Sequence, residues 1–315
     1  MGHAVVTGQA ATLGCPPGSW LVVGGSGQVG GALLEHLGPS ARWSARQPSA
    51  PFRLDLAELS TTPSPAARLL EQLGPRVVVI TAGMTNVDAC EDDVETARRL
   101  NTEGPAVLAS LARRVGARTV LLSTDYVFDG LAGPYDESAS PRPLSVYGAT
   151  KLEGERAVLE ADPDALVVRT TVVYGPDRAG KNFACRLLER LGRGLLSEVP
   201  CDQISSPTYN RDLAACIVRA VDAGWNGVLH VAGPDLMARD DFARSIAKAW
   251  GHDPGLVRSV RTDQLHQRAP RPARAGLRSG RHHLELRPVP EALSHWRGEP
   301  DLRTPTAKDP DLARR

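Results

Sequence analysis

The sequence predicts an α/β fold with a doubly wound parallel sheet and a smaller C-terminal lobe. From Trp20 onward, short apolar runs alternate with helical patterns, which is typical of a parallel sheet with crossover helices. Small or polar residues end each apolar run, as at the carboxyl edge where open α/β sheets bind ligands. A glycine-rich turn, residues 24–30, lies between the first apolar run and the first helical pattern. Together these features predict a ligand-binding sheet rather than a barrel or a bundle.

The expected elements follow in chain order. Strands are predicted over 20–24, 41–45, 76–81, 118–123 and 165–169. Helices are predicted to begin near Gly27, Ser64, Glu91, Gly104 and Ser145. After Gly175 the pattern changes to helices over 183–193, 211–223 and 239–250, with short strands over 196–199 and 227–231. We assign this later part mainly to the smaller lobe.

Length and composition limit the function classes. The 315 residues are 42% hydrophobic and 23% charged, as in an ordinary globular protein. The net charge of +1 gives no concentrated basic surface for a nucleic acid. No run approaches the 18 apolar residues that a membrane-spanning helix needs. Five cysteines without a CxxC pair predict neither a disulfide framework nor a zinc site, and a cytoplasmic location is expected.

The glycine turn predicts a dinucleotide site. Gly24, Gly27 and Gly30 form a GxxGxxG pattern, with Gln28 and Val29 at the start of the helix. Small residues allow a tight turn and let the backbone approach a pyrophosphate at the positive helix N-terminus. A turn that needs glycine for its shape alone is the alternative, but the flanking strand and amphipathic helix favour the dinucleotide.

The end of the second expected strand bears on the choice of cofactor. An NAD enzyme usually places a carboxylate there for the ribose 2′-hydroxyl, and this chain has none. Ser44 and Arg46 could instead hold a 2′-phosphate, which favours NADPH, with NADH as the alternative and a solvated Arg46 as the simpler interpretation. Further cofactor contacts are expected from Asp55, Leu56, Ala82, Gly83, Thr85 and Ser123.

A tyrosine and a lysine one helical turn apart predict the catalytic centre. Tyr147 and Lys151 lie at i and i+4, on one helix face, and both are also expected to contact the cofactor. Reduction of a ketone needs a proton donor for the oxygen, and an adjacent ammonium lowers the pKa of a phenol toward the working range. Thr124, at the end of a preceding strand, would donate a hydrogen bond to the substrate oxygen.

The chain is expected to divide into four parts. These are a loose extension over 1–18, a Rossmann-type NAD(P)-binding domain over 19–175 whose core continues into later segments, a lobe over 176–297 that mainly binds substrate, and a flexible tail over 298–315.

Several segments resemble the dTDP-4-dehydrorhamnose reductase family of extended short-chain dehydrogenases over about residues 20–296. The most specific are Ser123-Thr-Asp-Tyr-Val-Phe-Asp-Gly130, Pro134-Tyr135-Asp136-Glu137, Tyr147-Gly-Ala-Thr-Lys151, Arg169-Thr-Thr-Val-Val-Tyr174-Gly175, Lys181-Asn182-Phe183 and Asp202-Gln203. The resemblance implies NADPH or NADH as cofactor and a nucleotide-linked sugar as the small-molecule substrate, reduced at a 4-keto group. It also implies substrate contacts for Thr124, Asp125, Tyr126, Val172, Asn182, Phe183 and Gln203.

Three positions depart from the pattern of that family. Val172 replaces a Trp of the sugar-facing wall, and Ser205 replaces a small Gly. Residues 271–277 replace a stretch rich in Ser and Asp. These departures leave the sugar open, and with it whether the substrate is a nucleotide sugar.

Two other functions use the same residues. A sugar epimerase would employ the same Tyr and Lys and retain its NAD, whereas a dehydratase needs a carboxylic acid where this chain has Tyr126. A non-catalytic member that resembles the regulatory β subunit of methionine adenosyltransferase would bind NADP without turnover. No metal site is predicted, because the histidines lack ligand spacing. A homodimer is our working assumption.

Overall fold

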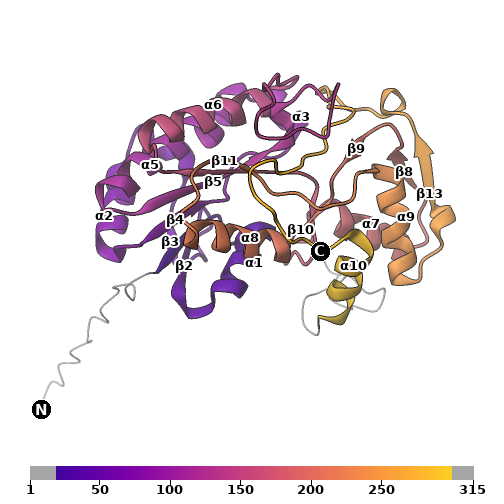
Figure 1. Ribbon diagram of the computed structural model, residues 1–315, viewed down its shortest axis with the longest axis horizontal. Helices are drawn as coiled ribbons and strands as arrows, with labels where there is room; N and C mark the ends of the chain where they lie inside the picture. Colours follow the sequence, from indigo (N-terminus) through magenta and orange to yellow (C-terminus); the bar gives the residue numbers. More distant parts are fainter. Residues whose placement is uncertain (1–18, 300–315) are drawn as a thin grey trace, which may run out of the picture.

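The computed structural model describes residues 19–299 and contains a seven-stranded, all-parallel sheet in the order β11-β6-β5-β4-β1-β2-β3 (Figure 1). This confirms the predicted fold class. The strands are Trp20–Val23 (β1), Ala41–Ala45 (β2), Phe52–Arg53 (β3), Val77–Ile80 (β4), Arg118–Thr124 (β5), Leu166–Thr170 (β6) and Gly227–His230 (β11). The expected extension over 1–18 and most of the expected tail lie outside the described residues.

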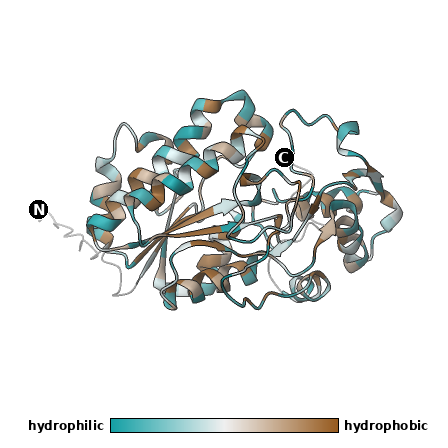
Figure 2. Cartoon of the chain, turned by 45° about the horizontal axis from the view of Figure 1, so that its top comes forward, coloured by the Kyte–Doolittle hydropathy of each residue, from teal (hydrophilic) through white to brown (hydrophobic). Residues whose placement is uncertain are grey.

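Helices cover both faces of the sheet, as the apolar strands require. One face is covered by α2 (Ser64–Leu73), α5 (Gly104–Arg114) and α6 (Val146–Ala161), and the other by α1 (Gln28–Leu37) and α8 (Asn210–Asp222) (Figure 1). All four residues of β4 are buried, because a central parallel strand contacts helices on both sides. The hydrophobic colour of Figure 2 is accordingly concentrated on the strands between the two helical layers.

The helical stretch before α5 differs from the expected start near Glu91. The helix α3 (Val87–Asp92) begins earlier because the Asn86 side chain caps it, accepting a hydrogen bond from the Ala89 amide at 3.1 Å. A second short helix, α4 (Val94–Arg98), follows. Between α4 and α5 the chain forms one π-helical turn, Arg99–Glu103. No sequence pattern had indicated this turn.

The smaller lobe has a core of its own. Its helices are α7 (Phe183–Gly192), α9 (Arg239–Trp250) and α10 (Val289–Gly298), which pack around β8 (Ser197–Pro200) and its parallel partner β13 (Val257–Val260). Two further pairs of short strands lie in the chain between β6 and α9. They are β7 (Val173–Tyr174) with β10 (Thr208–Tyr209), and β9 (Ile204–Ser205) with β12 (Met237–Ala238).

The strand expected over 227–231 belongs to the large sheet rather than to the lobe core. As β11 it pairs with β6, from Gly227 opposite Leu166 to His230 opposite Arg169. The preceding helix, α8, packs on the sheet beside α1. A short apolar run does not reveal which strand it pairs with. The sequence therefore predicted this strand but not its position in the large sheet.

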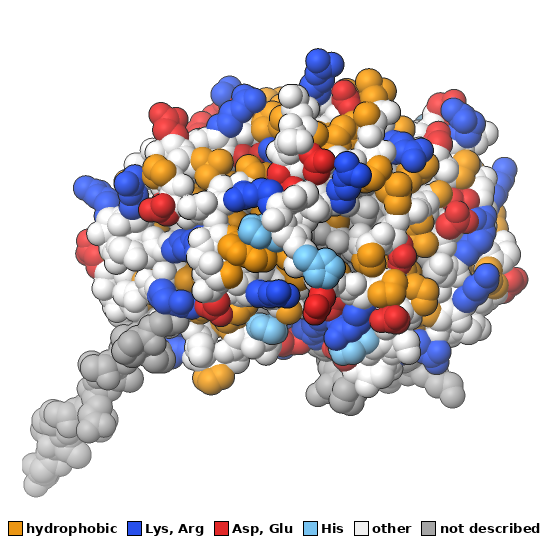
Figure 3. Space-filling view, in the orientation of Figure 1, with side chains coloured by type: hydrophobic (Ala, Val, Ile, Leu, Met, Phe, Trp, Pro, Cys, Tyr) orange, Lys and Arg blue, Asp and Glu red, His pale blue; other side chains and the backbone are white. Residues whose placement is uncertain are grey.

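The described surface carries both signs of charge. Basic and acidic side chains are interspersed over the face drawn in Figure 3. Within residues 19–299 no helix is long and apolar enough to span a membrane, and no cluster of His, Cys, Asp and Glu could hold a metal ion.

Candidate active site

The glycine turn leaves the N-terminus of α1 open. The amides of Gly24 and Gly25 donate to the Ser44 carbonyl at 2.8 and 3.3 Å, which ties the turn to β2. Gly24 has φ +95°, and a Cβ there would lie 2.7 Å from the Ala82 amide nitrogen. Gly27 caps α1 without a side chain, and a Cβ on it would approach only the Gly24 carbonyl, at 3.4 Å. The free helix amides are thus available to an anionic group.

A cavity of about 670 Å³ opens in front of this turn, along the carboxyl ends of β1, β2 and β4. It gathers most of the predicted cofactor contacts. Those that line it are Gly24, Gly27, Gln28, Val29, Gly30, Arg46, Asp55, Leu56, Ala82, Gly83 and Thr85. Asp55 also caps a short helical turn, since its carboxylate accepts from the Ala57 amide at 3.1 Å.

Ser44 is not where the prediction requires it. Its side chain is fully buried and does not line the cavity, whereas Arg46, just past the end of β2, does. Two polar residues that the sequence did not indicate take this place beside Arg46. The Ser26 hydroxyl donates to Gln47 Oε1 at 3.1 Å, and both residues line the cavity.

The predicted catalytic side chains meet at the carboxyl end of β5. Helix α6 begins there because Ser145 caps it, accepting from the Gly148 amide at 3.3 Å. Lys151 Nζ donates to the Leu122 carbonyl of β5 at 2.7 Å. Thr124 ends that strand next to the Tyr147 phenol, and its own hydroxyl donates to Asp125 at 3.1 Å. Both Tyr147 and Lys151 are nearly inaccessible to solvent, so the surroundings control their charge.

Burial acts in opposite directions on the two groups. It raises the pKa of Tyr147 above its usual range, and the neighbouring Thr124 hydroxyl offsets this only in part. The phenol is therefore protonated and can donate. Burial lowers the pKa of Lys151 to about 8, although the Glu155 carboxylate favours the charged form. The arrangement can deliver a proton to a substrate oxygen and stabilise the charge left on the phenol.

Asp125 and Tyr126 form the wall next to this pair. Asp125 accepts from the Thr171 hydroxyl at 2.7 Å and from Thr124 at 3.1 Å, and burial raises its pKa to about 6. The Tyr126 ring meets that of Tyr147 edge-on, with 5.4 Å between the ring centroids. Burial also raises the pKa of Tyr126, so the phenol is neutral.

Two arginines that the sequence did not indicate face Tyr126, and the positive charge of each acts to lower its pKa. The Arg239 guanidinium stacks 5.1 Å from the Phe183 ring centroid, and Arg271 donates to Asp88 at 2.9 Å. Within residues 19–299, Arg239 Nε and Arg271 Nη1 are buried without a hydrogen-bond partner. Of the two, only Arg271 lies in a segment that the sequence had singled out, residues 271–277. Buried donors of this kind require an acceptor, which an anionic ligand would supply.

The segment 271–277 crosses the site as a strap. The Ala273 carbonyl accepts from the Ile204 amide at 2.7 Å, the Arg274 amide donates to the Gly130 carbonyl at 2.9 Å, and the Gly276 carbonyl accepts from the Tyr135 amide at 2.8 Å. These bonds fix the strap between the β5 loop and β9, which holds Ser205. The backbone thus sets the position of Arg271.

The other predicted substrate contacts are engaged within the protein. Asn182 caps α7, accepting from the Cys185 amide at 2.9 Å and donating to the Gly175 carbonyl at 2.9 Å. Gln203 is buried and donates to Thr262 Oγ1 at 3.2 Å. Val172 follows Thr171 at φ +41°, a left-handed conformation that is rare for a β-branched residue. Of these predicted positions, the structure brings Phe183 beside Arg239.

Asn101 is a further residue that the sequence did not reveal. It is fully buried in the π-helical turn, and its amide bonds both the Met84 amide (2.9 Å) and the Met84 carbonyl (3.1 Å). It also donates to Thr150 Oγ1 on α6, at 3.2 Å. Asn101 therefore joins the loop that lines the cofactor cavity to the helix of Tyr147 and Lys151.

A family model described as "RmlD substrate binding domain" matches residues 19–298. A dTDP-4-dehydrorhamnose reductase of Mycobacterium tuberculosis is 39% identical over 278 residues, or 85% of this chain and 88% of that one. A probable dTDP-4,6-dihydroxy-2-methyloxan-3-one 4-ketoreductase of Streptomyces antibioticus is 37% identical over 81% of this chain and 84% of that one. The crystal structure of a dTDP-4-dehydrorhamnose reductase from Bacillus anthracis in complex with NADP is similar with a TM-score of 0.81. It is 28% identical and covers 89% of this chain and 98% of that chain.

Proposed function

The chain belongs to the dTDP-4-dehydrorhamnose reductase family of NAD(P)H-dependent reductases, and from this premise we propose that it uses NADPH to reduce a C4 keto group of a nucleotide-activated deoxysugar. The resemblance drawn from the sequence motifs is confirmed by the same matches. One observation carries the proposal. The Tyr147 phenol, the Lys151 ammonium and the Thr124 hydroxyl converge at the end of β5, beside a cavity that begins at an open helix N-terminus.

The cavity residues fit a dinucleotide. The side-chain-free cradle of Gly24, Gly27 and Gly30 allows a pyrophosphate to reach the α1 amides. Arg46, with Ser26 and Gln47, offers a charged and hydrogen-bonding group for a 2′-phosphate, which supports NADPH over NADH. When bound there, the cofactor supplies the hydride.

The chain's own residues would supply the proton. Tyr147 donates its phenolic proton to the carbonyl oxygen, and Thr124 holds that oxygen through its hydroxyl. Lys151 stabilises the phenolate that remains, since an ammonium one helical turn away favours the charged form of the phenol. In the structure the Thr124 hydroxyl donates to Asp125 at 3.1 Å, so its proton must turn toward the substrate oxygen when the substrate binds.

The anionic character of the substrate is supported by the two arginines. Arg239 Nε and Arg271 Nη1 lack partners among the described residues and act on Tyr126, at the edge of the catalytic pair. A diphosphate would satisfy both guanidinium groups, and the relatives named above act on dTDP-sugars. We therefore assign the nucleotide end of the substrate to the region between α9, the strap and Phe183.

The test is an NADPH-oxidation assay over a panel of dTDP- and UDP-linked 4-keto-6-deoxysugars. At least one member should be reduced, and Y147F should lower kcat by about 10²- to 10⁴-fold, as removal of a general acid does. NADPH binding by Y147F, followed by fluorescence, should stay near wild type. Tight NADPH binding with no turnover across the panel would contradict the proposal, as would full activity of Y147F.

The arginines give a second prediction. R239M and R271M should each raise KM for the reduced sugar by about tenfold or more, because a charge-assisted hydrogen bond contributes about 1.5–3 kcal/mol. The KM for NADPH should not change. R258M is a matched control, since Arg258 is an exposed residue of β13 paired with Glu198. An unchanged sugar KM in both test variants would refute this placement.

A further inference from the structure

A network of buried polar side chains extends from the catalytic helix, α6, across the ends of the neighbouring strands β5 and β6. Glu155, one turn beyond Lys151 on α6, accepts from Arg169 Nε at 2.9 Å and from Arg169 Nη2 at 2.6 Å. The Ser123 hydroxyl of β5 donates to the same carboxylate. The side chains of Glu155 and Arg169 are only 2% and 5% exposed. A fully buried ion pair therefore lies one helical turn from the proposed catalytic lysine.

The far end of this network contacts aromatic and backbone groups. Arg169 lies 5.3 Å from the Phe128 ring centroid, and its Nη1 is 3.5 Å from His230 Nε2. His230 Nδ1 is 3.2 Å from the Tyr135 carbonyl oxygen, and the His230 amide donates to Glu137 at 2.9 Å. Burial and the neighbouring Arg169 lower the pKa of His230, so the imidazole is neutral.

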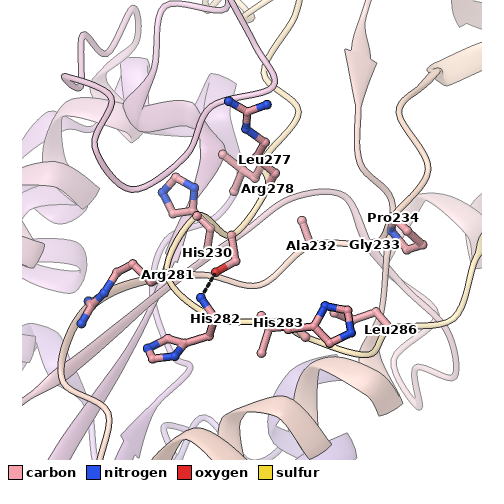
Figure 4. Close-up of a pocket in the computed structure, with 13 residues that line it drawn as sticks. His230, Ala232, Gly233, Pro234, Leu277, Arg278, Arg281, His282, His283 and Leu286 are labelled. Carbon is pink, nitrogen blue, oxygen red and sulfur yellow. Dashed lines mark hydrogen bonds between the residues drawn. The ribbon is translucent and has the colours of Figure 1, made fainter.

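The network ends at a surface cavity of about 470 Å³ that His230 lines (Figure 4). In that view the Arg278 and Arg281 side chains point away from each other rather than toward a common centre. They contact Asp136 and the backbone carbonyls of residues 226 and 228. The charged groups among the described residues that line this cavity do not converge on one point. We therefore seek the role of the network at its other end, near Lys151.

We propose that Glu155 is a positioning residue of the reaction: its carboxylate, fixed by Arg169, is the counter-charge that keeps Lys151 an ammonium. The proposal rests on the role given to Lys151 in the proposed function.

The geometry gives the physical reason. Lys151 Nζ is nearly inaccessible and is bonded to one carbonyl oxygen, that of Leu122, at 2.7 Å. A single neutral acceptor offsets little of the cost of burying an ammonium, so a nearby anion is needed. Glu155, one helical turn away on α6, is the anion that acts on Lys151 at longer range than a salt bridge, and its field raises the pKa of Lys151 against the effect of burial.

The other groups packed around Lys151 do not replace Glu155. Tyr147 on the same helix is a neutral phenol, and Ser123 on β5 is uncharged. Arg169 on β6 has the same sign as the ammonium, and His230 on β11 is neutral. Glu137 lies beyond His230, bonded to its amide. Arg169 has the separate task of fixing the carboxylate, because an unpaired buried carboxylate would be too costly to stay ionised.

The first test needs neither cofactor nor substrate. Urea unfolding of the wild-type chain, E155Q, K151M and the double variant forms a cycle whose coupling term measures the interaction of the two side chains. We expect a favourable coupling below about pH 8, where Lys151 is charged, which fades as the pH rises above that value. A coupling of zero, or one that does not change between pH 6 and pH 10, would overturn the proposal whether or not the chain reduces any sugar.

The second test separates charge from structural support. E155Q and R169K both lose the two-pronged bond and should both lower the unfolding temperature. Only E155Q should move the alkaline limb of the NADPH-oxidation profile to lower pH, by about one unit, or tenfold in the Lys151 ionisation constant. E155D keeps the charge and should restore the wild-type limb, which also provides a reading if E155Q folds poorly. Equal shifts in E155Q and R169K, or no shift in either, would show that the pair is only structural.

Discussion

At the scale of single residues, burial controls the chemistry of the site. Tyr147, Lys151 and Asp125 are all shielded from solvent, and burial shifts each pKa toward the neutral form. The phenol therefore holds its proton, while the lysine depends on a nearby carboxylate. The same shielding makes Asp125 sensitive to pH in a range where an exposed carboxyl would already be ionised.

Asp125 yields a prediction about stability. In the folded protein its pKa is about 6, above the value of 3.8 expected in the unfolded chain. Its contribution to the free energy of unfolding is therefore fully present below about pH 4 and is lost as the pH rises through 6. D125N removes this loss. The free energy of unfolding of D125N should gain on wild type between pH 4 and pH 7, by no more than about 3 kcal/mol, at about 1.36 kcal/mol per pKa unit.

A neighbouring carboxyl provides the control. Hydrogen bonds from Tyr135 and the Leu131 amide lower the pKa of Asp129, four residues along the same loop. Its stabilisation is thus present at neutral pH and lost on acidification, so D129N should approach wild type as the pH falls. Urea unfolding at several pH values checks both trends. A constant difference between D125N and wild type would count against the burial of an ionisable Asp125.

Some of these side chains could be read from the sequence. Tyr147 and Lys151 were predicted because their spacing places them on one helix face and they follow a glycine loop, an α/β pattern and a strand that ends in Ser-Thr. Thr124 was predicted because it ends an apolar run. Ser44 could not be placed, since its orientation depends on which way β2 faces. Arg239 and Arg271 were missed because they are far apart in the sequence and meet only through the strap.

At the scale of elements, the π-helical turn between α4 and α5 joins two parts of the site. Such turns are frequent at functional sites because the extra residue redirects a side chain out of the regular helix. Here the redirected residue is Asn101, which bonds the Met84 backbone in the cofactor loop and Thr150 in the catalytic helix. A widened turn has no sequence signature, so the prediction gave only the helix that follows it.

Loss of the Asn101 amide should weaken cofactor binding. N101A leaves the Met84 amide without its acceptor and frees the loop that lines the cavity, so Kd for NADPH should rise by about tenfold, and stability should fall by about 1–3 kcal/mol. Isothermal titration and urea unfolding measure the two effects. S110A is a matched control, because Ser110 is an exposed residue of α5. An unchanged Kd for N101A would remove the link between the π-helical turn and the cofactor.

Length explains only part of which remaining elements the sequence predicts, since α10 and β13 were missed. The five early strands were predicted as short apolar runs, and the helices α7, α8 and α9 because each carries several turns of a helical pattern. The two-residue strands β3, β7, β9, β10 and β12 are too short for any periodicity. They form where the chain between longer elements passes beside a neighbour, which only the tertiary fold decides.

At the scale of the whole molecule, the order of the chain interleaves the two halves. The chain leaves the sheet at β6, builds α7 and β8 of the lobe, and then returns to supply α8 and β11 before entering the lobe again at α9. The apolar cluster beneath α1 includes residues of β6 as well as of α8 and β11, for example Val168, Ile217 and Leu229. The expected boundary at residue 175 therefore remains a proposal about function rather than a line between two cores.

This arrangement predicts the behaviour of a fragment. Residues 19–175 alone would expose the β6 edge and the apolar surface that α8 covers in the full chain, so the fragment should bind the dye ANS and associate in size-exclusion chromatography. Loss of the buried groups of α8 alone, at about 25 cal/mol per Å² of apolar surface, removes several kcal/mol. The full chain under the same conditions is the comparison. A monomeric fragment that unfolds cooperatively would disprove the prediction.

The return of the chain to the sheet also limits how this architecture can be altered over time. Recombination that exchanges a terminal module needs one junction. This lobe is built from two stretches of chain, one between β6 and α8 and one after β11, so replacing it needs several junctions and would disturb the packing of Ile217 and Leu229. We therefore expect a change of substrate preference to come from point substitutions near the site, at positions such as Val172 and the strap, rather than from exchange of the lobe.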